Sequence, residues 1–225
     1  MRIGGLQKLS LIDYPGKVAA IVFTQGCNFR CPYCHNPELV LPEYFGAVIP
    51  EEEVLSFLKR RRGQLTGVVI TGGEPTQQRD LILFLQKIKG LGYAIKLDTN
   101  GSHPRVLKKV IQQHLADHIA MDIKAPLNEY QKVAGVKVDT SCVRESIEIL
   151  RISGIPYEFR TTLVKPLLSA NALPDIMALI GDTPRYVVQM FKPGEKLLDK
   201  TLLSKSHYSE EEITAIKRQY ERRLS

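Results

Sequence analysis

The sequence contains no apolar run long enough to cross a membrane. No stretch of its 225 residues reaches the ~18 apolar residues that a transmembrane helix needs. The N-terminus, MRIGGLQKLSLIDYPGK, has neither an extended apolar segment nor a small-residue cleavage site, so it does not read as a secretion signal. We therefore expect a cytoplasmic protein with no membrane partner.

Cysteine is scarce, and its placement disfavours a disulfide framework. Of only four cysteines, Cys27, Cys31 and Cys34 fall within eight positions, in QGCNFRCPYCHNP. Such crowding in a reducing compartment favours metal binding over disulfide pairing. The fourth, Cys142, lies in a stretch with a helical pattern, and we expect it to be a small buried residue without a chemical role.

Three thiolates leave a metal coordination shell incomplete. Structural zinc sites and ferredoxin-type clusters normally use four protein ligands. The triplet suits a zinc ion whose shell is completed by His35, or an iron–sulfur cluster with one iron open to an outside ligand. The spacing alone leaves both alternatives open.

The positive charge of the chain is not concentrated on one segment. The sequence holds 31 Lys and Arg against 24 Asp and Glu, a formal charge of +7. The densest basic runs, at 59–62 and 218–223, fall near the ends of predicted helices, where the helix dipole favours cations. This distribution disfavours nucleic acid as a partner, and an acidic face on a partner protein fits it better.

Short β-rich segments alternate with helical patterns along the chain. Continuous apolar strands separated by helices indicate a parallel sheet covered by helices. Six strand–helix units are too few for a complete eight-stranded barrel, so the pattern predicts an α/β fold that is either a partial barrel or an open doubly wound sheet. No linker interrupts the series, and we expect a single domain over 1–225. The predicted strands are 18–26, 67–73, 93–101, 117–126, 157–164 and 185–191, and the predicted helices are 50–63, 81–92, 104–115, 141–154, 172–181 and 209–224.

Two predicted helices carry signals at their N-termini. Pro50 suits the first turn of its helix, and the three glutamates at 51–53 lie at the positive end of the dipole. Ser209 and Glu212 have the spacing of a capping box.

Polar side chains gather where the predicted strands end. The cysteine loop follows the first strand, TGGEPT (71–76) the second, DTNGS (98–102) the third and MDIK (121–124) the fourth, while Arg160 and Gln189 lie in the last two strands. Parallel α/β folds collect ligands and catalytic groups at the carboxyl ends of strands. We expect these six places to converge on one rim.

The motifs resemble those of a known family. CxxxCxxC at 27–34, followed by GGE at 72–74, resembles the radical S-adenosylmethionine superfamily. The longer context SLIDYPGKVAAIVFTQGCNFRCPYCHNPELV, with TGGEPT, DTNG and MDIK, is similar to the glycyl-radical-enzyme activases, above all those of anaerobic ribonucleoside-triphosphate reductase. The similarity covers nearly the whole chain. It implies a partial (β/α)6 barrel of the radical SAM type.

The resemblance also implies cofactors and a reaction. Cys27, Cys31 and Cys34 would bind three irons of a [4Fe-4S] cluster, and S-adenosylmethionine would chelate the fourth. Reductive cleavage of S-adenosylmethionine would yield a 5′-deoxyadenosyl radical that abstracts a hydrogen atom. The implied partners are a glycyl radical enzyme, expected to be anaerobic ribonucleotide reductase, and flavodoxin or ferredoxin as electron donor.

Roles for other residues follow from the same resemblance. Gly72 and Gly73 would let the backbone approach a ligand closely, and Glu74 would support the methionine amino group. The carboxylates of Asp98 and Asp122 would hold a cation or ribose hydroxyls. The other implied contacts to S-adenosylmethionine are Tyr33 at the adenine, Thr99, Lys124 at the ligand carboxylate, Arg160 and Gln189.

Each of these residues has a plain structural alternative. Glu74 precedes a proline, so its alternative role is to mark the end of a strand. DTNG has the composition of a turn, because Asn-Gly favours a left-handed backbone conformation. Asp122 and Lys124, two apart on one face of a strand, would also make a structural ion pair. We expect His35 to stabilise its loop through the backbone rather than to bind metal.

Other functions remain open. One is a radical S-adenosylmethionine enzyme with a small-molecule substrate, such as 7-carboxy-7-deazaguanine synthase, although no extra set of substrate-binding polar groups is evident. Another is an activase of a pyruvate formate-lyase-type enzyme, against which Gln189 counts, because those activases carry a histidine there. A zinc or electron-transfer module built on the three cysteines and His35 would leave GGE, DTNG and DIK unexplained. The cysteine count excludes additional ferredoxin-like clusters.

Overall fold

The computed structural model describes residues 1–194 and 196–221. The described chain forms two compact units, which are treated separately below. The first unit comprises residues 1–28, 38–99 and 103–119, and the second comprises residues 29–37, 100–102 and 120 onward.

Seven strands follow one another in chain order in a mostly parallel sheet, which confirms the predicted α/β fold. The second strand pairs in parallel with the third, the third with the fourth, and the sixth with the seventh. The six predicted strands correspond to the second through seventh. The strands are β1 (Ile3–Ser10), β2 (Ala19–Thr24), β3 (Gly67–Gly72), β4 (Ala94–Thr99), β5 (His118–Asp122), β6 (Tyr157–Leu163) and β7 (Tyr186–Met190).

Strand β1 was not predicted. It pairs with β2 in the antiparallel sense, from Ile3 opposite Thr24 to Ser10 opposite Ala19. Its sequence, IGGLQKLS, begins with two glycines after the isoleucine, and glycine weakens a strand pattern. A side chain at Gly4 would come within 2.5 Å of Gln25, so tertiary packing, not strand propensity, explains that glycine.

The six predicted helices are all present. They correspond to α2, α3, α4, α6, α7 and α8, and the end of the predicted helix 209–224 lies outside the described residues. Helices α1 and α5 were missed because four or five residues give no readable periodicity. The helices are α1 (Pro37–Val40), α2 (Glu51–Arg60), α3 (Leu81–Gly90), α4 (Pro104–Gln112), α5 (Tyr130–Ala134), α6 (Thr140–Arg151), α7 (Leu173–Ile180) and α8 (Glu210–Tyr220), with 3-10 turns η1 (Pro42–Tyr44), η2 (Pro75–Gln77), η3 (Ala170–Ala172) and η4 (Lys200–Ser204).

The predicted helix starts agree with the structure in most details. The capping box is confirmed, because Ser209 Oγ accepts a hydrogen bond from Glu212 N at 3.1 Å and Glu212 Oε2 accepts one from Ser209 N at 2.7 Å. The glutamates at 51–53 occupy the first turn of α2. Pro50 is the N-cap residue that precedes this turn, so its predicted place inside the helix was wrong by one position.

Cys142 lies on α6 as predicted, but it is only half-buried. The buried face of α6 carries Val143, Ile147 and Leu150, and Cys142 lies beside this stripe in the first turn. Its Sγ lies 3.8 Å from Asp139 Oδ2 near the protein surface. The expectation of a buried cysteine was therefore wrong, although the helix was correct.

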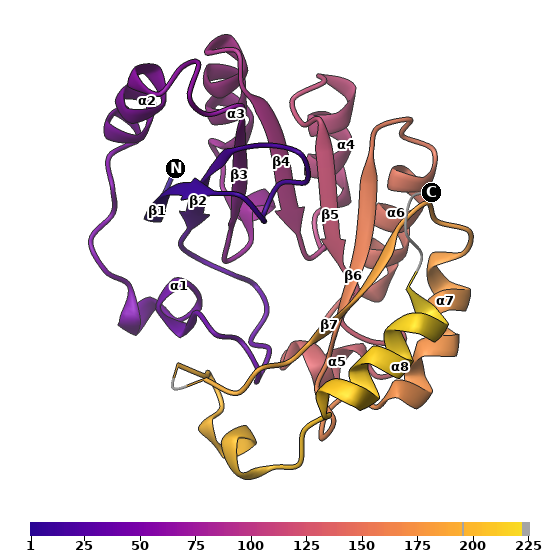
Figure 1. Ribbon diagram of the computed structural model, residues 1–225. Helices are drawn as coiled ribbons and strands as arrows, with labels where there is room; N and C mark the ends of the chain where they lie inside the picture. Colours follow the sequence, from indigo (N-terminus) through magenta and orange to yellow (C-terminus); the bar gives the residue numbers. More distant parts are fainter. Residues whose placement is uncertain (195, 222–225) are drawn as a thin grey trace. The chain divides into compact units, whose positions relative to one another are not determined.

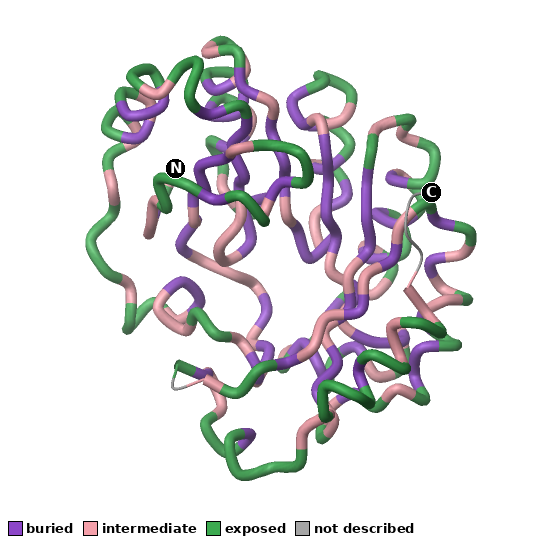
Figure 2. The backbone as a smooth tube through the Cα atoms, viewed as in Figure 1, coloured by how far each residue is buried: buried purple, intermediate pink, exposed green. Residues whose placement is uncertain are grey.

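Each unit has its own apolar core, visible as the buried segments in Figure 2. In the first unit β2, β3 and β4 are buried along almost their whole length, as strands covered on both faces should be. Helix α3 packs beside β4 there, and in the second unit α8 packs beside β7. Within the described residues, no helix is long and apolar enough to cross a membrane.

Candidate functional site

The GGE segment of the first unit folds back onto the end of β2. Gly73 N donates a hydrogen bond to Thr24 O at 2.9 Å, and Glu74 N donates one to Gly26 O at 2.8 Å. A Cβ atom at Gly72, whose φ is +112°, would lie 2.3 Å from Thr24 N, and one at Gly73 would lie 2.1 Å from Gly26 O. Both positions require glycine because backbone packs on backbone. The close approach seen here is to the chain itself, directly before Cys27.

Glu74 is fully buried and its carboxylate is held by donors from two elements. Its Oε1 accepts hydrogen bonds from Thr76 N at 3.0 Å, from the Thr76 hydroxyl, and from the Thr99 hydroxyl at 2.8 Å. Glu74 is also the N-cap of η2. Thr99, for which ligand contact was predicted, thus donates a hydrogen bond from its hydroxyl to Glu74.

Asp98 forms an ion pair within its own strand. Lys96 Nζ lies 2.8 Å from Asp98 Oδ1, and the two side chains share a face of β4 because they are two residues apart. Lys96 is buried, which the sequence did not predict, since lysine is almost never buried unless it is paired.

The DTNG segment forms the turn that the sequence analysis gave as its structural alternative. Asn100 Oδ1 accepts a hydrogen bond from Ser102 N at 3.0 Å, the Asx geometry that such sequences favour. Gly101 has φ of +74°, and a Cβ atom there would collide with the side chain of Met121. The turn is therefore packed tightly within the second unit.

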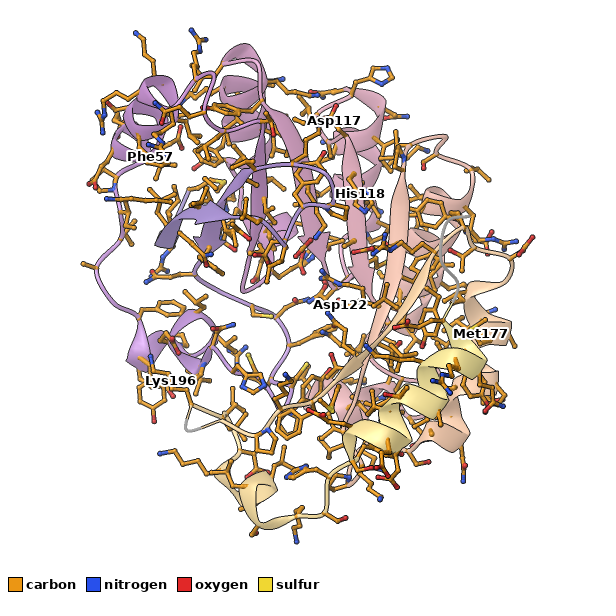
Figure 3. The ribbon with its side chains drawn as sticks, viewed as in Figure 1. Phe57, Asp117, His118, Asp122, Met177 and Lys196 are labelled. Atoms are coloured by element: carbon orange, nitrogen blue, oxygen red, sulfur yellow. The ribbon has the colours of Figure 1, made fainter. Side chains whose placement is uncertain are left out.

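In the second unit, Asp122 binds two cations. Arg160 Nε lies 2.8 Å from Asp122 Oδ1, and Lys124 Nζ lies 3.1 Å from Asp122 Oδ2. Asp122 is the last residue of β5, where Figure 3 labels it. Lys124 lies two residues beyond the strand, so the expected shared strand face was wrong, but the ion pair forms.

These charges shift the protonation equilibria of the group. Burial by itself would raise the pKa of Asp122, but Arg160 and then Lys124 outweigh it and hold that pKa well below its usual range. Burial would lower the pKa of Lys124, yet the carboxylate of Asp122 keeps it well above its ordinary value. At neutral pH the group therefore contains one anion and two cations.

The second unit also contains the cysteine loop from Phe29 onward. Cys34 N donates a hydrogen bond to Cys31 O at 2.9 Å and closes a turn, and Arg30 N donates one to Ala134 O at 2.8 Å. Burial raises the pKa of the Cys31 thiol, and the ammonium group of Lys124 opposes this shift.

Tyr33 lies between the two cysteines of this turn with its ring buried. The Lys124 ammonium lies 6.0 Å from the ring centroid, within the range of a cation–π contact. Burial raises the pKa of Tyr33 well above its ordinary value. In the described part of the chain, the Tyr33 hydroxyl has no hydrogen-bond partner.

The segment after β7 holds the cysteine loop in place, a feature that the sequence analysis missed. Leu198 N donates a hydrogen bond to Cys34 O at 3.0 Å, and Asp199 N donates one to Pro32 O at 2.9 Å. Phe191 stacks on His35 with ring centroids 5.4 Å apart. The ring of His35 thus contributes to the loop directly, and we name this contact set the Phe191 clamp.

Gln189 has a partner in the neighbouring strand. Its Oε1 accepts a hydrogen bond from the Thr162 hydroxyl at 3.3 Å, and the two residues are paired in the register of β6 and β7. Arg160 lies on β6 as predicted.

The four cysteines, all of which lie among the described residues, form no disulfide. Cys27 belongs to the first unit, and Cys31 and Cys34 belong to the second. Residues 1–194 and 196–221 contain no group of three or more His, Cys, Asp or Glu side chains placed to hold one metal ion. Thiolates are the donors that iron–sulfur clusters take, and the Lys124 ammonium opposes the rise in the pKa of the Cys31 thiol that burial causes. The donor set therefore fits the predicted cluster.

Comparisons with known proteins identify the family. The model of the radical SAM superfamily matches residues 21–180. A Methanocaldococcus jannaschii protein provisionally named as a glycyl-radical enzyme activating enzyme is 32% identical over 198 residues, which cover 86% of this chain and 81% of that protein. The pyruvate formate-lyase-activating enzyme of Clostridium pasteurianum is 31% identical over 128 residues, 55% of this chain and 52% of that enzyme.

Two further comparisons concern an enzyme with a small-molecule product and a solved structure. The 7-carboxy-7-deazaguanine synthase of Aquifex aeolicus is 32% identical over 87 residues, 39% of this chain and 38% of that enzyme. Among solved structures, Streptococcus suis SuiB bound to S-adenosylmethionine matches with a TM-score of 0.67 and 15% identity, over 88% of this chain and 45% of that chain. At this identity the likeness shows the fold alone.

The chain belongs to the radical SAM superfamily, whose members use a [4Fe-4S] cluster and S-adenosylmethionine. It is an enzyme of this class, and the family of glycyl-radical enzyme activating enzymes contains its relatives. The predicted family and cofactors are thereby confirmed.

Proposed function

We propose that this chain is an activase that installs a glycyl radical on a partner enzyme, and that the partner is anaerobic ribonucleoside-triphosphate reductase. The observation that carries the activase proposal is the match to an activating enzyme along 86% of this chain. The match to a small-molecule enzyme, 7-carboxy-7-deazaguanine synthase, covers only 39% of the chain, which supports the activase. The specific partner rests on the SLIDYPGK and CHNPELV context of the cysteine loop.

Cys27, Cys31 and Cys34 would hold the cluster as thiolates. When bound, the cluster supplies the electron that cleaves S-adenosylmethionine reductively. The chain's own contribution at this point is electrostatic, because the Lys124 ammonium opposes the rise in the pKa of the Cys31 thiol that burial causes. Asp122 keeps that ammonium protonated and in place, since its Oδ2 lies 3.1 Å from Lys124 Nζ.

Glu74 would bind the methionine ammonium group of S-adenosylmethionine. Its Oε1 already accepts three hydrogen bonds from the protein. These three hydrogen bonds hold the carboxylate in a fixed position. The main-chain bonds of Gly73 and Glu74 to residues 24 and 26 fix the carboxylate beside the start of the cysteine loop.

The other predicted contacts would complete the ligand site. Lys124 is a candidate partner for the ligand carboxylate, because Asp122 shares its charge with both Lys124 and Arg160 and leaves the group with a net positive charge. Gly72, Gly73, Thr99 and Gln189 are further ligand contacts that we propose. We also propose that Tyr33 and Asp98 contact the ligand.

Two further proposals concern the whole chain. We propose that residues 1–225 form a single domain and that flavodoxin or ferredoxin is the electron donor.

An anaerobic assay tests the proposal. The protein is reconstituted with iron and sulfide, reduced, and given S-adenosylmethionine with and without anaerobic ribonucleotide reductase. We expect 5′-deoxyadenosine from wild type and a glycyl radical signal by electron paramagnetic resonance on the reductase. Cys31→Ala should lose both, whereas Cys142→Ala, a matched change at a thiol outside the motif, should keep both.

The outcomes separate the levels of the proposal. Cleavage of S-adenosylmethionine without a radical on the reductase would reject that partner and direct the search to pyruvate formate-lyase-type enzymes or a small-molecule substrate. Equal activity of wild type and Cys31→Ala would overturn the radical mechanism itself.

A further inference from the structure

A histidine outside the predicted motifs belongs to a hydrogen-bonded series that reaches Glu74. His103 Nδ1 lies 3.3 Å from the hydroxyl oxygen of Thr76, and this hydroxyl also contacts Glu74 Oε1. All three residues belong to the first unit, together with Thr99, whose hydroxyl bonds to the same oxygen of Glu74.

Counting protons sets the direction of this series. The Thr76 hydroxyl has one proton to donate and lone pairs to accept with, and an ionised carboxylate is an acceptor only. Glu74 Oε1 accepts from Thr76 N and from the Thr99 hydroxyl, so it acts as the acceptor toward the Thr76 hydroxyl as well. The Thr76 hydroxyl proton is therefore used in the bond to Glu74, and the Thr76 oxygen acts as the acceptor toward His103. His103 Nδ1 must then carry the hydrogen of this second bond.

The backbone of His103 is anchored by the start of α4. His103 is the N-cap residue of this helix, and its carbonyl accepts hydrogen bonds from Val106 N at 3.0 Å and Leu107 N at 3.1 Å. Pro104 follows at the first helical position, where its fixed φ favours helix initiation. The imidazole therefore projects from a rigid element and not from a mobile loop.

We propose that His103 is a positioning residue for Glu74 and acts through the hydroxyl of Thr76. The series Nδ1–H to Thr76 Oγ1, and Thr76 Oγ1–H to Glu74 Oε1, fixes the plane of the carboxylate and so the direction of its other oxygen. This inference rests on the proposed role of Glu74 as the partner of the ammonium group of S-adenosylmethionine. It adds Thr76 and His103 to the residues that determine affinity for an α-amino acid ammonium group.

The tautomer of His103 is the first test, and it needs neither cluster nor ligand. Long-range proton–nitrogen NMR of ¹⁵N-histidine-labelled protein distinguishes Nδ1–H from Nε2–H rings, at about pH 8, well above the ordinary imidazole pKa of about 6.5. We expect Nδ1–H in wild type and in Thr76→Ser. Thr76→Val removes the acceptor and should release this tautomer preference. A wild-type ring with a bare Nδ1 would overturn the inference.

Ligand affinity is the second test. The reconstituted protein is titrated anaerobically with S-adenosylmethionine, and we expect His103→Leu to bind it up to about tenfold more weakly, which is the effect of losing one hydrogen bond between neutral groups. His103→Asn places an amide N–H near the position of Nδ1–H and should restore most of the affinity. The KM for S-adenosylmethionine should rise in His103→Leu, while kcat changes little.

Glu74→Gln separates the two levels of the argument. If Glu74→Gln leaves affinity unchanged, the proposed role of Glu74 fails, whatever His103 does. If Glu74→Gln weakens binding but His103→Leu and Thr76→Val do not, the inference on His103 alone fails. Circular dichroism of each variant checks the fold, and Thr76→Val gives a second, smaller change should His103→Leu not fold.

Discussion

Arg160 donates a hydrogen bond from Nε to Oδ1 of Asp122 at 2.8 Å, and this places a guanidinium opposite the last residue of β5. Lys124 takes the second oxygen of the same carboxylate. The three side chains come from β5, β6 and the loop that follows β5, so one anion joins the two strands at the end where the cysteine turn of the second unit also lies. This arrangement has a direct consequence for stability.

Asp122→Asn removes the anion that the two cations share. Because the side chain is partly exposed, we expect the free energy of unfolding at pH 7 to fall by about 2 kcal/mol, below the loss typical of fully buried pairs. The pKa of Asp122 is depressed in the folded state, so its stabilisation is complete above the ordinary carboxyl pKa of about 3.9 and is lost as pH falls toward the folded value. Urea titrations should show a smaller difference between wild type and variant at about pH 3 than at pH 7.

A matched control for this change is Glu129→Gln. Glu129 lies 3.7 Å from Lys132 in an exposed i,i+3 pair, and its loss should cost less than about 0.5 kcal/mol. A difference for Asp122→Asn no larger than that of the control, or one that does not depend on pH, would contradict the account of Asp122.

Gly73→Ala tests the packing of the GGE segment on residues 24–26. The added Cβ would lie 2.1 Å from Gly26 O, and backbone cannot yield as the end of a flexible side chain does. We expect the free energy of unfolding to fall by about 3 kcal/mol or more, measured by urea denaturation. Gly90→Ala is the control, because nothing lies within 4 Å of its added Cβ and the residue is helical, so stability should be unchanged or slightly higher. Equal effects of the two changes would refute the packing argument.

Lys96→Met tests the ion pair inside β4. The change leaves Asp98 without its cation in a buried setting, and we expect a loss of about 3 kcal/mol in the free energy of unfolding. Lys87→Met serves for comparison, since Lys87 Nζ pairs with Glu51 Oε1 at 2.6 Å from an exposed position, and this change should destabilise the protein much less. Thermal or urea unfolding at neutral pH measures both, and a larger loss for Lys87 would show that burial does not decide the effect.

Phe191→Ala tests the Phe191 clamp on the cysteine loop. Loss of the stack on His35 should allow the following segment to open, and the amides of Leu198 and Asp199, which bond to Cys34 O and Pro32 O, should exchange with solvent faster. Hydrogen exchange followed by NMR measures this directly. Leu203→Ala, a truncation of an exposed side chain on η4, should leave these amides protected. Unchanged protection in Phe191→Ala would mean that the main-chain bonds hold the loop without the ring.

The sequence predicts the elements whose signals are local. Each of the six strand–helix units has a periodic apolar pattern of sufficient length. The start of helix α8 is also indicated by the capping box of Ser209 and Glu212. Strand β1 carries no such pattern, because Gly4 and Gly5 are present for packing rather than for strand propensity. Its pairing with β2 is decided by tertiary structure.

In the candidate site, too, local sequence motifs indicated some residues, while others are evident only from tertiary contacts. The motifs CxxxCxxC, GGE and MDIK led to the predictions for Cys31, Glu74 and Asp122 through their resemblance to a known family. They gave no role to Thr76, although TGGEPT contains it, and they did not indicate His103 or Phe191, whose contacts join residues far apart in the sequence. The only local sign of His103 was its place directly before Pro104 at a helix start.

The main-chain bonds from Gly73 to Thr24 and from Glu74 to Gly26 have a consequence for protein engineering. Two motifs that lie almost fifty positions apart share one piece of backbone architecture, and the Thr24 hydroxyl adds a hydrogen bond to Thr71 O at 3.1 Å. A chimera that imports a cysteine loop from a relative must therefore import residues 24–26 and 72–74 as a pair. If only one of the two segments were grafted, its backbone would not be matched to the segment with which it forms these hydrogen bonds.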